Sequence, residues 1–155
     1  MAVLLDWGVK YYLGRPATEA ERADFVALWQ PLFAELDRGP KTWCLRDFHS
    51  PNLMWLAERT GLARLGILDF QDTILGSPAY DVASLAQDAR VTVPPELERD
   101  LVSAYVAARA ADPRFHVEQF GRAYAILAVE RATRLLGQFP RLKLRDGKPG
   151  YLRHI

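Results

Sequence analysis

Three polar side chains near the middle of the chain have the types and the spacing that phosphoryl transfer requires. Asp47 and Asn52 lie in the stretch "CLRDFHSPNLMWL" with four residues between them, and Asp69 follows an apolar run in "ILDF". Phosphoryl transfer depends mainly on positioning and charge stabilisation, and it needs a carboxylate that orients or accepts the proton of the attacking hydroxyl. It also needs hard oxygen ligands for Mg²⁺. We expect Asp47 to be the proton acceptor, and Asn52 and Asp69 to hold the metal.

Each of these residues also has an ordinary structural explanation. Asp47 could cap a turn, and Asn52 could be a turn residue after Pro51. Asp69 could simply end a strand. The three residues together, in this order and between strand-like segments, favour the catalytic interpretation over three separate turn residues.

Three neighbouring side chains are candidates for supporting roles. Asp72 lies three residues beyond Asp69 and is either a further carboxylate of the metal site or a cap of its loop. His49 has apolar neighbours, where a histidine more often has a structural hydrogen-bonding role than a proton-transfer role. Asp81 lies near the start of an expected helix, where negative charge is favourable in any case.

The elements that must position these residues form a β-rich zone over residues 41–77. The segments "TWCL", "NLMWLA" and "ARLGILDF" have the lengths of strands, and turn-like residues separate them. We expect "ERTG" to be the loop of a hairpin that closes on Gly61. The loop with Asp47 then connects two strands.

Helices are expected on both sides of the β-rich zone. In residues 1–40, "VLLDWGVKYYLG" ends at Gly14 as C-cap, and the next helix begins after Thr18 as N-cap. Apolar residues of this second helix recur at helical spacing and predict one buried face: Phe25, Leu28, Trp29, Leu32, Phe33 and Leu36.

Three helices are expected in residues 78–155. "SPAYDVASLAQDA" has Ser77 as N-cap and Pro78 at the first helical position. "PPELERDLVSAYVAARA" and "HVEQFGRAYAILAVERATRLLGQF" follow, the first with an apolar face of Leu97, Leu101, Val102, Tyr105 and Val106. The whole chain is therefore expected to be a single α+β domain that is mostly helical.

Composition limits the classes of function. A chain of 155 residues, half of them apolar, is long enough for one domain with a hydrophobic core. A net charge of +1 gives no indication of a surface for nucleic acid or anionic membranes. The single cysteine, Cys44, cannot form an internal disulfide and fits a reducing compartment. No apolar run of about 18 residues suggests a membrane span. A cytoplasmic protein is expected.

The two polar loops resemble the motifs of a known family. "LRDFHSPN" is similar to the catalytic loop of aminoglycoside phosphotransferase-like kinases, usually H-G-D-x-H-x-x-N, and "ILDFQDTILGSPAYDVASL" is similar to their metal loop and the helix that follows. The resemblance implies the larger, C-terminal lobe of a protein-kinase-like fold, with ATP and Mg²⁺ as cofactors. It implies that Asp47 is the catalytic base and that Asn52 and Asp69 bind the metal.

The same resemblance assigns supporting roles and shows one departure. Asp81 resembles the aspartate that braces the catalytic loop from behind, and His49 occupies the position of the second motif histidine. The family's leading His-Gly is Leu45-Arg46 here. Arg46 resembles the arginine before the catalytic aspartate of protein kinases, so the bracing contacts of the loop are in question.

Within the family, the motifs and the late "LKLRDGKPGYL" look closest to bacterial amino-sugar kinases, which phosphorylate N-acetylmuramate or N-acetylglucosamine at the anomeric hydroxyl. The resemblance therefore implies a small-molecule substrate with a hydroxyl group. Aminoglycosides, choline-like and homoserine-like alcohols remain compatible with the same catalytic residues.

A complete kinase also needs a smaller lobe with a phosphate-covering loop and a strand lysine. No Gly-rich or P-loop motif occurs here, Lys10 lies in an expected helix, and Lys41 directly precedes the first strand. We expect this chain to be the larger lobe alone, with an open apolar surface that favours self-association or a partner lobe. The alternative is a non-catalytic docking module that has kept the fold.

The tryptophans allow two interpretations. Indole rings could form a platform for a sugar, but Trp29, Trp43 and Trp55 lie on an expected apolar face or in expected strands, which favours core packing. Trp7 is less constrained. The charges of "ERATR" and "RLKLRDGK" favour a solvated face over a site for a substrate carboxylate.

Overall fold

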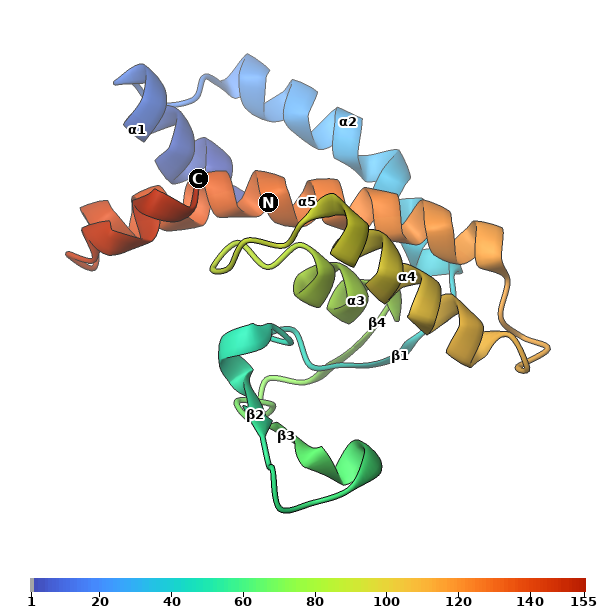
Figure 1. The fold of residues 1–155 in the computed structure, drawn as a ribbon. Helices are drawn as coiled ribbons and strands as arrows, with labels where there is room; N and C mark the ends of the chain where they lie inside the picture. The colour runs from blue at the N-terminus through green and yellow to red at the C-terminus, as the bar shows by residue number, and fades with distance from the viewer. Residues whose placement is uncertain (1) are drawn as a thin grey trace. The chain divides into compact units, whose positions relative to one another are not determined.

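The computed structural model describes residues 2–155, which form two compact units. One unit comprises the chain up to Arg38 together with residues 128–155, and the other comprises residues 39–127. Helices dominate both, and the strands are short and antiparallel (Figure 1), so the expected mostly helical α+β class is confirmed. The assignment of all 155 residues to a single lobe remains a prediction.

The first unit is entirely helical. It begins with a π-helical turn (Leu4–Gly8), followed by α1 (Val9–Leu13) and α2 (Glu19–Arg38). The second half of α5 (Val117–Leu144 as a whole) and a final 3₁₀ turn (Pro149–His154) complete it. Gly14 ends α1 as predicted. Its φ of 68° is left-handed, which glycine adopts without the steric cost of a Cβ atom, and its N–H donates to the Lys10 carbonyl at 3.1 Å.

The start of α2 is fixed by a reciprocal cap. The Thr18 hydroxyl accepts a hydrogen bond from the Glu21 N–H at 3.2 Å, and the Glu21 carboxylate accepts one from the Thr18 N–H at 2.8 Å. This capping box satisfies two backbone donors that would otherwise lack helical partners. The predicted role of Thr18 is confirmed.

The apolar face predicted for α2 is only partly buried. Trp29 is buried and its ring stacks on Phe33 at 5.5 Å between centroids. Leu28, however, is 71% exposed. The prediction was wrong for Leu28, because Leu28 lies on a side of α2 that no described residue covers.

A close backbone approach joins the N-terminal turn to α5. A Cβ atom on Gly137 would lie 2.4 Å from backbone atoms of Val3 and Leu4. Gly8, on the other side of this contact, would bring a Cβ within 2.9 Å of the Leu136 carbonyl oxygen. Glycine at these positions therefore allows two helical segments to pack at a distance that no other residue permits.

The second unit contains four short strands in two separate antiparallel pairs. β1 (Thr42–Cys44) pairs with β4 (Ile74–Gly76), and β2 (Leu53–Trp55) pairs with β3 (Leu65–Ile67). Three of the strands were predicted, but β4 was not recognised as a strand. Its partner, β1, lies at least thirty residues earlier in the chain, and local sequence patterns do not show such a distant pairing.

The loop of the β2–β3 hairpin is longer than predicted. Gly61 has a φ of 56°, as a loop-closing glycine can, but a 3₁₀ turn over Gly61–Arg64 follows it. The strand therefore begins at Leu65 instead of Ala63.

Helices follow the strands in the second unit: α3 (Ala79–Ala86), α4 (Pro95–Arg109) and the first part of α5. The prediction of Ser77 as N-cap and Pro78 as first helical residue was wrong by one position, because Pro78 is the N-cap and α3 begins at Ala79 without a side-chain cap. The Ser77 hydroxyl still accepts the Ala79 N–H at a long 3.4 Å. The ring of Tyr105 from α4 stacks on Phe120 from α5 at 4.9 Å. Helix α5 continues beyond the predicted end at Phe139, through Pro140, to Leu144.

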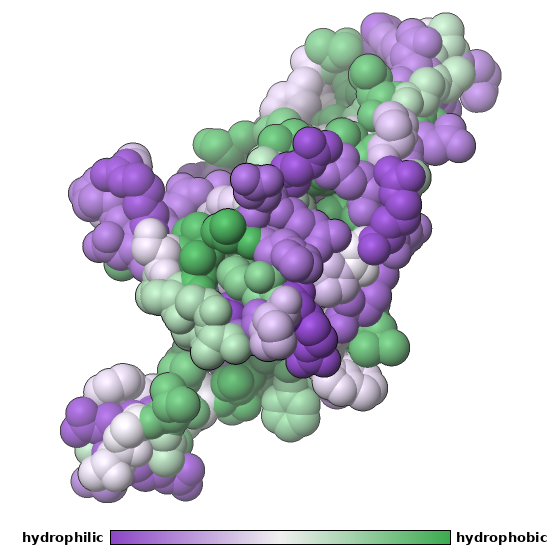
Figure 2. All heavy atoms as spheres, turned by 90° about the vertical axis from the view of Figure 1, so that its right-hand side faces the viewer, coloured by the Kyte–Doolittle hydropathy of each residue, from purple (hydrophilic) through white to green (hydrophobic). Residues whose placement is uncertain are grey.

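Two tryptophans of the strands lie outside the core, contrary to prediction. Trp43 is 70% exposed and Trp55 is 67% exposed, whereas Trp29 is buried as predicted. A two-stranded ribbon has two faces, and no described element covers the outer face of these ribbons. Apolar side chains remain visible among polar ones on the face shown in Figure 2. None of the helices in residues 2–155 is long and apolar enough to cross a membrane.

Candidate active site

The loop after β1 carries Asp47 and has a tightly hydrogen-bonded backbone. The Asp47 N–H donates to the Leu45 carbonyl at 2.8 Å, and the His49 N–H donates to the Asp47 carbonyl at 3.0 Å. The loop backbone therefore turns sharply around Asp47. Asp47 is exposed, which the role of proton acceptor expected for it requires.

Asp81, from the first turn of α3, holds the beginning of this loop. Its Oδ2 accepts the Leu45 N–H at 2.7 Å, and its Oδ1 accepts the Arg46 N–H at 3.1 Å. Asp81 thus contacts the loop as the motif resemblance implied. Both contacts go to backbone N–H groups, so they do not depend on the histidine and glycine that the family usually has at positions 45 and 46.

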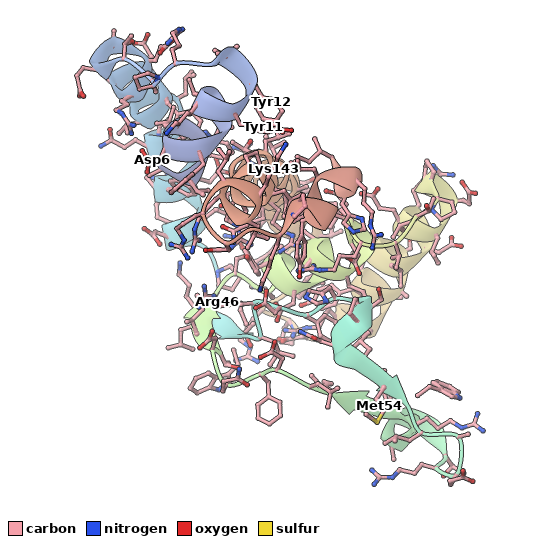
Figure 3. The ribbon with its side chains drawn as sticks, turned by 90° about the vertical axis from the view of Figure 1, so that its left-hand side faces the viewer. Asp6, Tyr11, Tyr12, Arg46, Met54 and Lys143 are labelled. Carbon is pink, nitrogen blue, oxygen red and sulfur yellow. The ribbon has the colours of Figure 1, made fainter. Side chains whose placement is uncertain are left out.

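Arg46 adopts a backbone conformation that glycine would adopt more easily. Its φ is 68°, in the left-handed region that costs a residue with a side chain about 1–2 kcal/mol. The Asp81 bond to its N–H and a 3.5 Å bond from the Ser84 hydroxyl to its carbonyl hold it there. Arg46 lies on the loop that leaves β1 (Figure 3).

Asn52 is held by three hydrogen bonds, two of which join it to the same loop. Its side-chain Nδ2 donates to the Asp47 carbonyl at 2.9 Å and its backbone N–H donates to the His49 carbonyl at 2.9 Å. Its own carbonyl accepts the Leu68 N–H at 2.9 Å. Because the NH₂ group of the amide faces the loop, its oxygen is left as an available hard ligand.

The register of the β2–β3 hairpin brings Asn52 and Asp69 to the same end of the ribbon. Leu53 pairs with Ile67, and the Leu68 N–H then bonds the Asn52 carbonyl, so Asp69 lies two residues beyond the last pair of the ribbon. Asp69 has a φ of 56°, and one of its carboxylate oxygens accepts a hydrogen bond from Gln71. A left-handed aspartate at a loop is a strained position of the kind that functional sites retain.

The donor set fits Mg²⁺ rather than a transition metal. No group of three or more His, Cys, Asp or Glu side chains in residues 2–155 is arranged to hold a metal. Asn52 and Asp69 offer one amide and one carboxylate oxygen, and Mg²⁺ commonly takes one or two carboxylates and completes its shell with water and phosphate oxygens. These two residues suit a metal that arrives with a nucleotide.

Asp72 is exposed in the turn between β3 and β4. The Thr73 N–H and hydroxyl both donate to the Phe70 carbonyl and close this turn around it. The structure does not bring Asp72 to the loop of Asp47 by any hydrogen bond of its own. Its role as a metal-site carboxylate remains a prediction.

Asp88 is a functional candidate that the sequence did not single out. Its side chain is buried, with the residue 3% exposed, and its Oδ2 accepts both the Ser50 N–H at 3.0 Å and the Ser50 hydroxyl at 2.6 Å. Its Oδ1 accepts the Arg90 N–H at 2.9 Å. No local pattern indicates it, because Asp88 lies two residues beyond the last residue of α3 and its contact with Ser50 spans 38 residues.

Burial and hydrogen bonding act in opposite directions on the pKa of Asp88. Burial alone would raise this pKa, but the hydrogen bonds from Ser50 and Arg90 and the charge of the buried His49 outweigh it and hold the pKa below its usual value. Asp88 is therefore an anion under the loop. His49 is 6% exposed and lies within the core, and its structural role remains a prediction.

Cys44, at the end of β1, is not a reactive thiol. Burial, together with the negative charge of Asp81, raises its pKa to about 11. Its Sγ lies 3.1 Å from the Ser77 carbonyl oxygen, which packs the end of β1 against the start of α3. It serves the positioning of the loop through packing.

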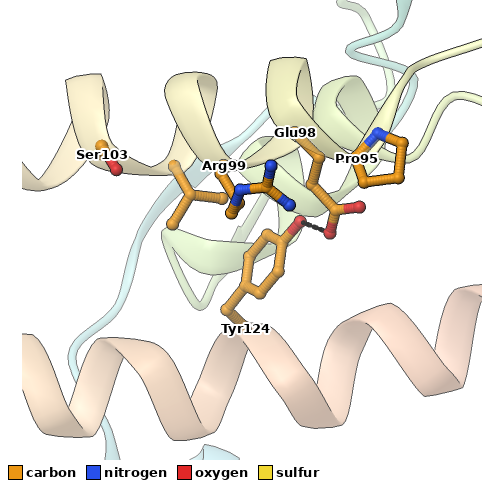
Figure 4. A pocket seen from close by; sticks show the side chains of 6 residues that line it. Pro95, Glu98, Arg99, Ser103 and Tyr124 are labelled. Atoms are coloured by element: carbon orange, nitrogen blue, oxygen red, sulfur yellow. Dashed lines mark hydrogen bonds between the residues drawn. The ribbon is translucent and has the colours of Figure 1, made fainter.

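A separate groove of about 450 Å³ lies between α4 and the first part of α5. Its side chains include Glu98, Arg99 and Tyr124, and the Tyr124 hydroxyl donates to Glu98 at 2.7 Å (Figure 4). Gln87 donates to the same carboxylate at 2.7 Å. Burial, followed by the hydrogen bond to Glu98, raises the pKa of Tyr124. The Glu98 carboxylate and the Tyr124 hydroxyl of this groove are thus already paired within the protein.

Comparison with known proteins identifies the class. The chain belongs to the phosphotransferase enzyme family, which matches residues 5–143. The mostly helical fold, with its small ribbons, is consistent with the larger lobe of the kinase-like fold of that family.

The chain is similar to several curated relatives of one name. It is 44% identical over 132 residues, 85% of its length, to the N-acetylmuramate/N-acetylglucosamine kinase of Caulobacter vibrioides. It is 35% identical over 95% of its length to the kinase of the same name from Pseudomonas putida. It is 37% identical over 94% of its length to that of Neisseria meningitidis. The chain spans only 36% to 43% of the length of these relatives.

Proposed function

We propose that this chain is the catalytic lobe of an ATP-dependent kinase that transfers the γ-phosphate to a hydroxyl of an amino sugar. The observation that carries the proposal is the loop geometry. Asp47 lies exposed on a loop held by Asp81, and the Asn52 side chain bonds the Asp47 carbonyl from the start of the hairpin that ends at Asp69. Family membership supports the same chemistry.

In this proposal Asp47 accepts the proton of the attacking sugar hydroxyl as the bond to phosphorus forms, and the nucleoside diphosphate leaves. Asn52 and Asp69 hold Mg²⁺, which neutralises charge on the phosphates when it is bound. Asp81 acts on Asp47 only through the backbone of the loop. Arg46, His49 and Asp72 remain supporting residues in this proposal.

The amino sugar is the finer part of the proposal. The relatives are named for N-acetylmuramate and N-acetylglucosamine, which supports a substrate of this class. Another small alcohol, such as an aminoglycoside, would use the same catalytic residues. No surface for nucleic acid is proposed, because the net charge of the chain is only +1.

The strand region supports the further proposal that another lobe covers it. Large apolar side chains are exposed on and beside the two ribbons: Trp43, Met54, Trp55, Leu65, Ile67, Leu68, Phe70, Ile74 and Leu75. A surface of this composition is typical of an interface. Because the relatives are more than twice as long as this chain, we propose a smaller kinase lobe as its occupant, and self-association where that lobe is missing.

A second candidate function is a docking module without catalysis, which the same exposed apolar surface favours. The test is turnover of the complete protein with Mg-ATP and each of the two amino sugars. We expect phosphorylation, and we expect Asp47→Asn to lower turnover about 10²-fold or more with little change in Mg-ATP binding.

Near-normal turnover in Asp47→Asn would show that Asp47 is not the base. Absence of turnover in the unmodified complete protein with amino sugars and other small alcohols would favour the docking module. Asp112→Asn is a suitable control, because Asp112 is paired with Arg114 in the turn before α5 and makes no contact with the loop. The cytoplasmic location expected from the sequence remains a prediction.

A further inference from the structure

We propose that Asp88 is a positioning residue for the catalytic loop, and that Asp81 and Asp88 together hold the loop on both sides of Asp47. This inference rests on the proposed kinase function. It assigns to Asp88 a role that follows from its hydrogen bonds and not from any sequence motif.

The two aspartates bind different ends of one short loop. Asp81 accepts the N–H groups of Leu45 and Arg46, which lie directly before Asp47. Asp88 accepts the N–H and the hydroxyl of Ser50, three residues after Asp47. Asp47 therefore lies between two anchors, each of which holds a neighbouring part of the loop.

The two aspartates are held in place by different parts of the structure. Asp81 belongs to the first turn of α3, whereas Asp88 lies two residues after the last residue of that helix. The Arg90 N–H at 2.9 Å and the Arg90 guanidinium at 3.8 Å hold the Asp88 carboxylate from the other side. Because it is buried, Asp88 cannot replace a lost partner with water at no cost.

The second anchor lies on the path from the base to the metal ligand. The segment after Ser50 is the 3₁₀ turn Ser50–Asn52, and its last residue donates back to the loop through Nδ2 and N–H. Release of Ser50 would therefore let Asp47 and Asn52 move relative to each other. A displacement of about 1 Å at such a site can lower turnover about 10²-fold.

The effect of Asp88 should appear in kcat rather than in KM. The Asp88 side chain is buried and its hydrogen bonds go only to loop and turn groups, so it makes no contact with substrate in this arrangement. We expect Asp88→Asn to lower kcat about 10-fold in the complete protein, with KM for Mg-ATP and for the sugar within about 2-fold. Ser50→Ala should lower kcat less, and Ser50→Thr, which keeps a hydroxyl, should restore most of it.

Asp112→Asn is the matched control. Asp112 also accepts the N–H two residues ahead, from Arg114 at 3.0 Å, and also pairs with that arginine, at 3.1 Å. Asp112 also pairs with Arg109 at 2.8 Å and is less buried than Asp88, so it offers a similar turn and ion pair without the contact to Ser50. We expect Asp112→Asn to leave kcat unchanged.

Amide hydrogen exchange supplies a readout that does not require activity. In Asp88→Asn, the Ser50 N–H should exchange faster, while the Leu45 and Arg46 N–H groups, bound by Asp81, should keep their protection. Unchanged Ser50 exchange, or a kcat equal to that of the unmodified protein, would overturn the inference.

The kinase assay separates failure of this inference from failure of the proposed function. If Asp47→Asn abolishes turnover while Asp88→Asn leaves kcat unchanged, the proposed function stands and the role of Asp88 is refuted. If the unmodified protein has no turnover, the exchange experiment still decides whether Asp88 holds the loop.

Discussion

Replacement of Arg46 by glycine should stabilise the protein. The left-handed φ of 68° costs a residue with a Cβ atom about 1–2 kcal/mol, and glycine removes this cost. Glycine also makes the unfolded chain more flexible, which costs about 0.5–1 kcal/mol. The difference predicts a net gain of about 0.5–1 kcal/mol in the free energy of unfolding.

Thermal and denaturant unfolding of the complete protein measure this gain. For a domain of roughly 150–250 residues, about 1 kcal/mol corresponds to a rise in Tm of roughly 2–4 °C. Arg59→Gly is the control, because Arg59 is exposed and is not among the residues with positive φ. There glycine relieves no strain, so the free energy of unfolding should fall by about 0.5–1 kcal/mol.

A fall in stability for Arg46→Gly as large as for Arg59→Gly would refute this reasoning. It would mean that the Arg46 side chain makes interactions worth more than the backbone strain. Because the loop is held through backbone N–H groups, we also expect Arg46→Gly to keep near-normal turnover, and a large loss of kcat at unchanged stability would show a direct role for the guanidinium.

Three further predictions concern the metal, pH and the isolated chain. Asp69→Ala should raise the Mg²⁺ concentration needed for half-maximal turnover steeply, and Asn52→Ala more mildly, because each removes an oxygen ligand; titration curves that overlay that of the unmodified protein would exclude both residues from the metal site. The pKa of Asp88 is lowered on folding, so the ionised carboxylate stabilises the folded protein. This contribution is complete above the ordinary aspartate pKa of about 4 and is lost as the pH falls through the lowered pKa. Acid unfolding curves should thus become less steep in Asp88→Asn, and identical slopes would contradict this. The 155-residue chain alone should bind Mg-ATP only at about millimolar concentration, worth about 4 kcal/mol, and should not phosphorylate a sugar; micromolar binding in calorimetry would reveal a phosphate site within it.

Asp47, Asn52 and Asp69 could be proposed as site residues from the sequence because their types, their spacing and an adjacent apolar run are all local to the chain. Their catalytic and metal roles stay predictions. Thr18 and Gly14 were predicted for a similar reason, since caps depend on contacts within about four residues. Their hydrogen bonds appear in the structure as expected.

The features that the sequence did not reveal depend on distant partners. Strand β4 exists because residues 74–76 pair with residues 42–44, and Asp88 matters because it reaches Ser50, 38 residues away. Trp43 and Trp55 were assigned to the core because aromatic residues in strands are usually buried there. Only the arrangement of the ribbons shows that their outer faces have no covering layer among residues 2–155.

The unequal burial of the tryptophans means that intrinsic tryptophan fluorescence can report on the surface of the ribbons. Trp43 and Trp55, at 70% and 67% exposure, should emit at long wavelength and be quenched by small solutes, whereas buried Trp29 should emit at shorter wavelength and be protected. The Arg64 guanidinium lies 5.1 Å from the centre of a Trp55 ring and makes that indole sensitive to movement of the hairpin. A ligand or a protein lobe that covers the ribbons should therefore shift the emission to shorter wavelength, so its arrival can be followed without any attached dye.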